Sequence, residues 1–311
     1  MNIIFMGTAE LSCASLEGLA ADPRFKIAAV VTQPDKPRGR ELHLQQPPVK
    51  VLAQRLGLPV LQPPRARDEA FISELRAREP ELIVVAAYGH ILPQAILDMP
   101  RYGCLNVHTS LLPMYRGAAP IQWAIADGQI QTGATIMKMD AGMDTGPILS
   151  QKPTPILPEE DSASLHNRLA ILGAELLLET IPGYVSGNIQ PKPQPEGASY
   201  APKIKKEDGH INWNLAAQTI FNRMRAFRPW PGAFTFLKLD SKSLLLKIWQ
   251  ADVVESKGAA GRVLSADEHG IVIGCGDKAL QVMELQLEGG RRMRAREFLA
   301  GHSLKVGEHL Q

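Results

Sequence analysis

Uninterrupted apolar runs in the first third of the chain constrain its fold more than any other feature. Residues 81–88 (Glu-Leu-Ile-Val-Val-Ala-Ala-Tyr) show no polar alternation, which is typical of a strand covered on both faces. Similar short runs recur at residues 2–6, 26–33 and 103–110, and residues with helical apolar spacing lie between them. Strands that alternate with helices predict an α/β fold, a Rossmann-like doubly wound and mainly parallel sheet.

The strand expected at residues 103–110 carries two polar side chains, Asn106 and His108. Because side chains alternate across a strand, the two share a face about 7 Å apart along the chain. Asp144 follows in a glycine-rich segment that can fold back toward them. An amide, an imidazole and a carboxylate without a serine or cysteine nucleophile suit transfer of an acyl group directly to an amine. Taken singly, each residue also fits a structural role as a buried histidine, a turn former or a loop cap.

The turn after the first strand disfavours a dinucleotide site. It offers only Gly7-Thr8, without the second glycine that would admit a pyrophosphate, and the chain contains no P-loop sequence. Ligands of open α/β sheets bind beyond the carboxyl ends of the strands. The strands that lead to Tyr88 and to His108 both end there, so the expected site lies at this edge of the sheet.

A long connection at residues 33–48 joins the second strand to the next helix, and connections of this length are often functional. It carries Lys36, Arg38 and Arg40, which can donate charge-assisted hydrogen bonds to phosphate groups. The same cations also fit a solvated basic loop, and composition alone does not separate the two interpretations.

The chain of 311 residues exceeds what one ordinary core supports, and its pattern changes near residue 185. Residues 186–206 are rich in proline, which predicts an extended linker. Beyond the linker, short alternating segments separated by glycine turns predict a small β-barrel. We therefore expect a first domain of residues 1–185 and a second of residues 207–311.

Composition indicates a globular protein without a membrane span, since no apolar run approaches the roughly 18 residues that a span requires. The amino terminus lacks a basic leader and a small-residue cleavage site, so the expected location is the cytoplasm. The three cysteines lie far apart, which favours neither a disulfide framework nor a zinc site. We expect a monomer without a metal. A net charge of +2 does not by itself indicate a nucleic-acid partner.

Three neighbouring motifs carry a specific resemblance. They are Asn-Val-His-Thr-Ser-Leu-Leu-Pro at residues 106–113, Arg-Gly-Ala-Ala-Pro-Ile at 116–121 and Met-Asp-Ala-Gly-Met-Asp-Thr-Gly at 139–146. Together and in this order they closely resemble the folate-dependent formyltransferases. Further segments extend the likeness over nearly the whole chain, toward members that act on methionyl-tRNA, at residues 32–40, 209–213, 220–233 and 285–293.

The resemblance implies a formyltransferase domain joined to an OB-like barrel that binds tRNA. It implies 10-formyltetrahydrofolate as the formyl donor and initiator methionyl-tRNA as the acceptor. By motif position it implies a tetrahydrofolate-binding segment made of Ser110, Leu111, Leu112 and Pro113. It also implies a tRNA-contacting loop that includes Lys36, Arg38 and Arg40. After Arg40 the family's usual Gly-Lys-Lys is replaced by Glu-Leu-His, which removes two expected cations.

The implied reaction gives each of the three polar residues a role. The neutral α-amine attacks the formyl carbon, and Asn106 and His108 donate hydrogen bonds to the oxyanion that forms. Asp144 either holds His108 as an imidazolium or relays a proton from the amine to the folate nitrogen through water. Asp144, rather than Asp140, matches the catalytic aspartate of the family motif.

Three other functions fit part of the pattern. A sugar-amine N-formyltransferase would share the three polar residues and the Ser-Leu-Leu-Pro turn, and it is the main alternative; the basic loop and the C-terminal motifs favour tRNA. A glycinamide ribonucleotide formyltransferase would be a single shorter domain. A non-catalytic RNA-binding protein on this scaffold would keep the basic patches and lose the three polar residues.

Overall fold

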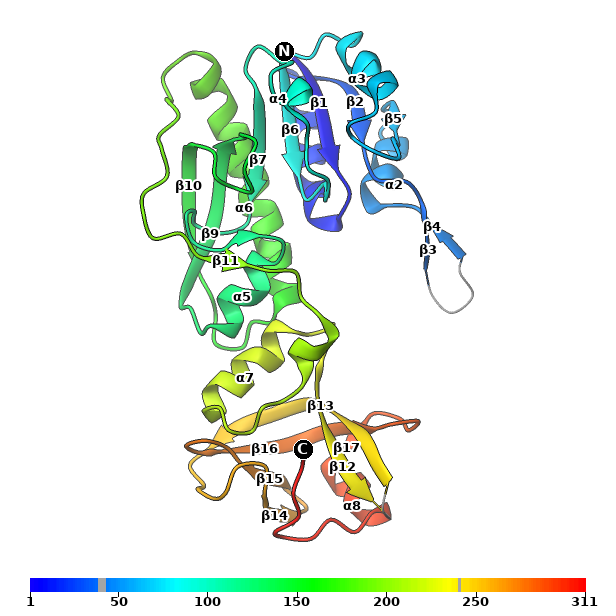
Figure 1. Ribbon diagram of the computed structural model, residues 1–311, viewed down its shortest axis with the longest axis vertical. Coiled ribbons are helices and arrows are strands. Elements are labelled where there is room, and N and C mark those ends of the chain that lie inside the picture. The colour runs from blue at the N-terminus through cyan, green and yellow to red at the C-terminus, as the bar shows by residue number, and fades with distance from the viewer. Residues whose placement is uncertain (39–42, 240–241) are drawn as a thin grey trace. The chain divides into compact units, whose positions relative to one another are not determined.

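A computed structural model describes residues 1–38, 43–239 and 242–311 (Figure 1). The chain divides into two compact units. The first contains Met1–Pro120, Gln131–Pro155 and Leu165–Ala201. The second contains Ile121–Ile130, Ile156–Ser164 and Pro202–Gln311. The domain limits expected from the sequence, at residues 185 and 207, stay a prediction.

A central sheet of seven strands organises the described part of the first unit, in the order β10-β9-β7-β6-β1-β2-β5. Its parallel members are β1 (Asn2–Gly7), β2 (Lys26–Val31), β5 (Val60–Leu61), β6 (Leu82–Ala86) and β7 (Cys104–His108). Two antiparallel strands complete one edge, β9 (Gln131–Lys138) and β10 (Ile148–Pro155). The expected mainly parallel α/β sheet is confirmed.

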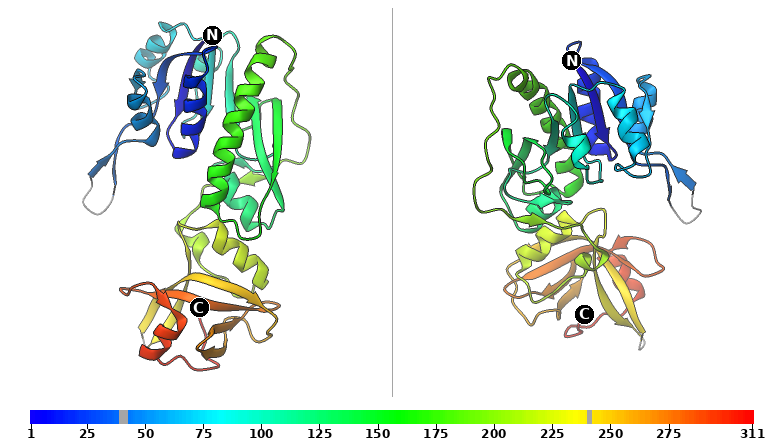
Figure 2. Two further views of the ribbon diagram at one scale, coloured as in Figure 1. Left: turned by 180° about the vertical axis from the view of Figure 1, so that it is seen from behind. Right: turned by 45° about the horizontal axis from the view of Figure 1, so that its top comes forward.

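Apolar side chains cover both faces of this sheet, because successive strand residues point to opposite sides. On one face Ile3 and Phe5 pack with α1, α2 and α6, and on the other Ile4 and Met6 pack with α3 and α4. Both views in Figure 2 show helices on the two sides of the strands. The helices of these layers are α1 (Cys13–Ala21), α2 (Pro48–Arg55), α3 (Glu69–Arg76), α4 (Gln94–Leu97) and α6 (Ser162–Val185), with the short η1 (Glu10–Ser12) before α1.

The strand β7 follows the same alternation, and this sets the direction of its polar residues. Leu105 and Val107 belong to the α6 face, whereas Cys104 belongs to the opposite face. The helix α6 packs closely there, since a Cβ on its Gly173 would lie 2.7 Å from Val107 Cγ1. Asn106 and His108 therefore share the face of Cys104, as the sequence predicted.

Two small ribbons complete the first unit. The connection after β2, expected as a loop, contains the antiparallel pair β3 (Lys36–Arg38) and β4 (His43–Gln45), and it extends away from the sheet (Figures 1 and 2). A parallel pair joins β8 (Arg116–Gly117) to β11 (Tyr200–Ala201). The segment that leads to β11 had been expected to be a linker.

The second unit is built on an antiparallel sheet in the order β12-β13-β16-β15-β14, with β17 beside β16. Its strands are β12 (Ala233–Leu239), β13 (Lys242–Val254), β14 (Val263–Asp267), β15 (Gly270–Gly274), β16 (Ala279–Leu287) and β17 (Met293–Arg294). Its helices are α7 (Ala217–Ala226) and α8 (Ala295–Gly301), with η2 (Lys206–Gly209) before α7, and α5 (Pro120–Ala126) falls almost wholly in this unit. Leu280, Leu285 and Phe298 are fully buried in its core. The second β domain expected from the sequence is confirmed, and its described strands form an antiparallel sheet.

Candidate active site

The three polar residues singled out in the sequence meet at the end of β7. Asn106 and His108 project from β7, and Asp144 comes from the loop between β9 and β10. The Asp144 carboxylate lies between the other two, with Oδ1 3.4 Å from Asn106 Nδ2 and Oδ2 3.7 Å from His108 Nδ1. The His108 side chain is 6% exposed and that of Asp144 15%. The imidazole is thus enclosed, while the carboxylate keeps limited access to solvent.

A backbone carbonyl fixes the other edge of the imidazole. His108 Nε2 lies 3.0 Å from the carbonyl oxygen of Tyr115. Because a carbonyl oxygen only accepts, Nε2 carries a hydrogen and Nδ1 faces the Asp144 carboxylate. A hydrogen on Nδ1 would point toward that carboxylate. Sequence reasoning missed Tyr115, since its contribution comes from the main chain.

The Asp144 carboxylate is held by a main-chain donor. Gly117 N donates to Asp144 Oδ2 at 2.8 Å. Asp144 itself adopts φ +53°, a left-handed conformation that is uncommon for residues other than glycine. Contacts from outside the loop are therefore needed to keep this backbone in place.

The neighbouring Asp140 has a different environment. Its Oδ1 accepts from Gly142 N at 3.0 Å and from Thr145 Oγ1 at 2.7 Å. Among the described contacts these partners lie within its own loop, whereas Asp144 contacts β7. Asp140 thus organises the loop from inside, and Asp144 is the carboxylate that faces the imidazole.

The turn that follows β7 is held by buried hydrogen bonds. Ser110 is fully buried, and its Oγ donates to the Met114 carbonyl at 2.6 Å. The Thr135 hydroxyl donates to the Ser110 carbonyl at 2.6 Å and accepts from Leu112 N at 3.1 Å. Ser110 and Leu112 therefore shape the turn, and Leu111 and Pro113 are the two of the expected folate-binding residues that stay partly exposed. Folate binding by these four residues stays a prediction.

Two of the expected tRNA-contacting residues, Lys36 and Arg38, lie in β3. Lys36 is exposed and donates to Gln33 Oε1 at 2.5 Å, and Arg38 ends β3. Arg40 lies outside the described residues. Within the described part of the chain, no hydrogen bond or ion pair joins this ribbon to Asn106, His108 or Asp144. The two sets of predicted site residues thus occupy separate places in the first unit.

The base of the ribbon is anchored by a carboxylate. Asp35 accepts from Gln62 Nε2 at 2.8 Å and pairs with Lys50 Nζ at 2.7 Å. Hydrogen bonds from Gln62 and from Lys50 hold the pKa of the Asp35 carboxyl below its usual range. The carboxylate is therefore charged at neutral pH and ties the ribbon to the helix α2, which contains Lys50.

The thiols of this chain are poorly suited to nucleophilic catalysis. Burial raises the pKa of Cys104 to about 12 and that of Cys275 to about 12. Burial, assisted by nearby glutamates, raises the pKa of Cys13 to about 11. A thiol attacks as its thiolate, so these cysteines are unreactive at neutral pH.

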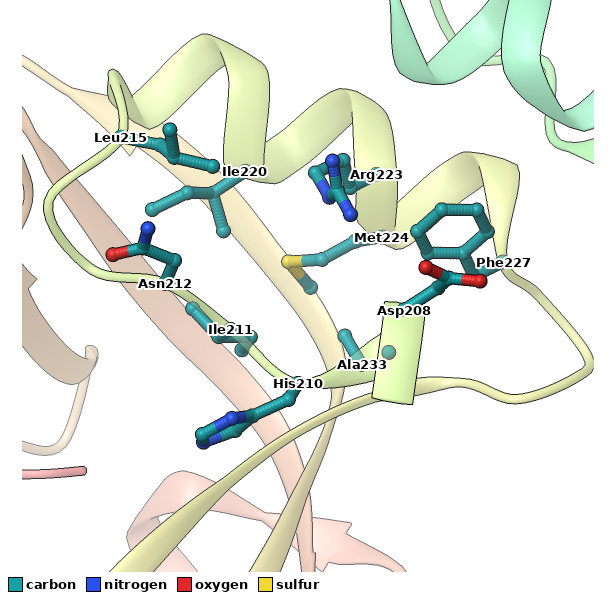
Figure 3. Close-up of a pocket in the computed structure, with 11 residues that line it drawn as sticks. Asp208, His210, Ile211, Asn212, Leu215, Ile220, Arg223, Met224, Phe227 and Ala233 are labelled. Carbon is teal, nitrogen blue, oxygen red and sulfur yellow. The ribbon is translucent and has the colours of Figure 1, made fainter. Parts of the chain in front are cut away.

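A small hollow in the second unit offers no room for a substrate. It lies beside α7 and is lined by Ile220, Met224 and Phe227 with Arg223 at its edge (Figure 3). Its volume of about 10 Å³ is at the limit of what one water molecule needs. Across the described residues, no three or more His, Cys, Asp or Glu side chains gather as metal ligands would. No helix in the described ranges has the length and apolar character of a membrane span.

Comparison with known proteins assigns both parts of the chain to one group. The formyl transferase model matches residues 1–181, and the model of the formyl transferase C-terminal domain matches residues 203–303. The methionyl-tRNA formyltransferase of Citrifermentans bemidjiense is 49% identical over 308 residues, which are 99% of this chain and 95% of that protein.

Solved structures share the fold at much lower identity. An N-formyltransferase from Helicobacter canadensis, in complex with folinic acid and dTDP-3-aminofucose, has a TM-score of 0.64 and 17% identity over 90% of this chain and 98% of that one. HypX from Aquifex aeolicus, in complex with tetrahydrofolic acid, has a TM-score of 0.60 and 19% identity, covering 99% of this chain and 48% of that one. At these identities the two structures establish the fold alone.

Proposed function

Because this chain belongs to the formyl transferase family, we propose that it moves the formyl group of 10-formyltetrahydrofolate onto the α-amine of methionyl initiator tRNA. The observation that carries the choice of acceptor is the 49% identity, over 99% of the chain, to a methionyl-tRNA formyltransferase. The product is the formylated tRNA that begins protein synthesis. The chemistry is direct attack by the amine, without an acyl-enzyme.

The residues at the end of β7 support this reaction in the following way. When the amine attacks the formyl carbon, the formyl oxygen becomes an oxyanion. Asn106 offers an Nδ2–H to that oxygen. His108 offers Nδ1–H as the imidazolium, because its Nε2–H is engaged by the Tyr115 carbonyl at 3.0 Å and Nδ1 carries a hydrogen only when the ring is doubly protonated. Removing one such donor typically costs about 3–4 kcal/mol of transition-state stabilisation.

Protons must move as well. Attack converts the amine into an ammonium group, and the folate nitrogen must gain a proton before it leaves. We assign this transfer to Asp144, whose carboxylate is 15% exposed and can exchange protons with the substrate through water. Its Oδ2 lies 3.7 Å from His108 Nδ1, which is too long for a hydrogen bond, so it also supports a protonated His108 by charge alone.

The substrates would occupy two sets of residues. The turn at Ser110, Leu111, Leu112 and Pro113 is the proposed tetrahydrofolate-binding segment. Lys36, Arg38 and Arg40 are proposed tRNA contacts, and the second unit is proposed to bind tRNA as well. We further propose that the protein acts as a monomer in the cytoplasm, where initiator tRNA is charged and used.

The decisive experiment offers acceptors in parallel. Purified protein and 10-formyltetrahydrofolate are incubated with initiator methionyl-tRNA, with elongator methionyl-tRNA and with a dTDP-linked amino sugar. We expect formyl-methionine to accumulate on the initiator tRNA well ahead of the other two acceptors. Formylation of the amino sugar without a tRNA product would replace this proposal by the sugar-amine alternative.

A further inference from the structure

The segment between α6 and β11 passes beside β10 before it reaches β11 (Figure 1). It is anchored at two points. Lys192 exchanges two backbone hydrogen bonds of 2.8 Å with Ile148, at the start of β10. Further along, Tyr200 and Ala201 form β11 beside β8. The part between these anchors is therefore held against the loops that supply Asp144 and Tyr115.

Gln194 lies in the middle of this segment, half-buried, with its amide fully used. Its Nε2 donates to the carbonyl oxygens of Asp144 and Gly146, each at 2.8 Å. Its Oε1 accepts from Arg116 Nε at 3.1 Å and from Arg116 Nη2 at 2.7 Å. A primary amide supplies two N–H donors and one carbonyl acceptor, and this environment satisfies all of them.

These hydrogen bonds connect the Asp144 loop to the segment that contains Arg116 and Gly117. The Asp144 carboxylate receives its main-chain hydrogen bond from Gly117, the residue after Arg116. Gln194 therefore ties the Arg116 side chain and the Asp144 main chain to one group. Asp144 adopts φ +53°, and an external bond to its carbonyl oxygen holds a conformation that the residue would otherwise leave.

The same segment also supports the imidazole. Ser199 Oγ accepts from Tyr115 N at 2.9 Å, and the Ser199 carbonyl accepts from Arg116 N at 2.9 Å. Tyr115 has φ +61°, and its carbonyl oxygen is the partner of His108 Nε2. One stretch of chain thus fixes the backbone behind both the carboxylate and the imidazole.

We propose that Gln194 is a positioning residue for formyl transfer, which holds the Asp144 loop so that the carboxylate faces His108 Nδ1. Gln194 bonds to the main chain of Asp144 and to Arg116, so it acts through the catalytic carboxylate. Its loss should slow the chemical step and leave substrate binding nearly unchanged. The kinetic form of this inference rests on the proposed function.

The chain offers a matched control for the test. Gln190 lies in the same segment and is exposed, and among the described residues its side chain donates to the Gly187 carbonyl of its own turn at 2.7 Å. We expect Gln194→Ala to lower kcat by about 10- to 100-fold, because small misplacements of catalytic groups have effects of this size. We expect the KM values for 10-formyltetrahydrofolate and tRNA to change less than about twofold on the same argument. Gln190→Ala should match the wild type in both parameters.

A second variant separates positioning from folding. Gln194→Glu keeps an acceptor for Arg116, loses both donors, and sets a carboxylate against the carbonyl oxygens of Asp144 and Gly146. It should be at least as slow as Gln194→Ala, and wild-type kcat in Gln194→Glu would overturn the inference. In an Asp144→Asn background, Gln194→Ala should add almost nothing to the loss, because both changes act on one group. A fully multiplicative loss in the double variant would overturn it too.

A readout without turnover distinguishes this inference from the proposed function. Amide hydrogen exchange in residues 139–147 should be faster in Gln194→Ala than in the wild type and in Gln190→Ala. Unchanged amide hydrogen exchange in this loop would contradict the positioning role of Gln194, whatever acceptor the enzyme formylates. A wild-type protein that fails to formylate tRNA would instead overturn the proposed function, and the exchange data would still decide the role of Gln194 in holding the loop.

Discussion

His108 Nε2 lies 3.0 Å from the Tyr115 carbonyl oxygen, while His108 Nδ1 faces the Asp144 carboxylate at 3.7 Å. The first contact specifies which nitrogen carries hydrogen, and the second specifies where the other nitrogen points. A buried imidazole with one edge held by the main chain can offer only its remaining edge to a substrate. The proposed oxyanion contact therefore uses Nδ1–H of the doubly protonated ring.

Replacing His108 by alanine should lower kcat by a factor of about 10²–10³, because the transition state loses one hydrogen-bond donor to the oxyanion. The affinity for tetrahydrofolate should change little, since the proposed folate contacts lie in the following turn. Steady-state formylation and folate titration measure the two effects. His166→Ala removes an imidazole in α6 and serves as the control. Near-normal kcat in His108→Ala would exclude the assigned role.

The two aspartates of the β9–β10 loop should respond differently to the same change. Asp144→Asn removes the charge that faces His108 and the proposed proton carrier, so kcat should fall by about 100-fold or more. Asp140→Asn keeps the Oδ1 that accepts from Gly142 N and Thr145 Oγ1, so activity should stay within about threefold on the hydrogen-bond argument. Initial rates at saturating substrates compare the pair. Equal losses in both variants would mean that only the shape of the loop matters.

Local pattern was enough to predict the parallel part of the sheet and the pair on β7. Asn106 and His108 could be placed on one face because strand alternation depends only on neighbouring residues, and the apolar run of β6 indicated burial on both faces. The edge strand β10 was harder to predict, since it contains Pro153 and Pro155, which are tolerated only where a strand lacks a partner on one side.

The supports of the site could not be predicted from local pattern. Gln194 bonds to Asp144, a residue 50 positions away, and the prolines around Gln194 indicated only an extended segment. Tyr115 contributes a main-chain carbonyl, which every residue carries, and Gly117 contributes a main-chain N–H, which every residue except proline carries. The second unit also includes residues 121–130 and 156–164, which precede the boundary expected at residue 185. Only the assembled fold brings such distant groups together.

Removing cations from the connection after β2 should weaken the binding of tRNA and leave the binding of the folate donor unchanged. Arg40→Ala and Lys36→Ala should each raise the KM for tRNA and leave the KM for 10-formyltetrahydrofolate unchanged, because phosphate contacts act on the acceptor alone. The slope of log affinity against log salt should become shallower by about one unit for each phosphate group that the protein no longer neutralises. Arg24→Ala is the control, because it removes the same charge from a residue that pairs with Asp22 at 2.5 Å. The same salt slope in all four proteins would count against a tRNA contact by the ribbon.

The Asp35 anchor should give acid-dependent stability. Its pKa is lowered by hydrogen bonds from Gln62 and Lys50. A carboxyl whose folded pKa lies below its unfolded value of about 3.9 stabilises the fold above that pH, and the contribution is lost as the pH falls through the folded value. The Tm of Asp35→Asn should therefore lie below that of the wild type at pH 7, and the gap should close as the pH falls below about 4. A Tm gap that stays the same from pH 7 to about pH 3 would contradict this anchor.

Gly117 should be intolerant of a side chain for a reason that concerns the site. It has φ +120°, and a Cβ there would lie 2.7 Å from the Ala201 carbonyl oxygen, so β8 and β11 would have to separate. That movement would withdraw the N–H that donates to Asp144 Oδ2 at 2.8 Å.

Gly197 gives the matched comparison for this position. It has φ +93°, with nothing within 4 Å of an added Cβ. Gly117→Ala and Gly197→Ala both place alanine in a conformation that disfavours it by about 1–2 kcal/mol, so both should lower the Tm. Only Gly117→Ala should also lower kcat, by roughly tenfold or more, because it alone disturbs the main-chain donor to the Asp144 carboxylate, the proposed catalytic group. Thermal unfolding and initial rates on the two variants measure these effects separately. A Gly117→Ala enzyme with normal kcat would show that Asp144 keeps its position without this hydrogen bond.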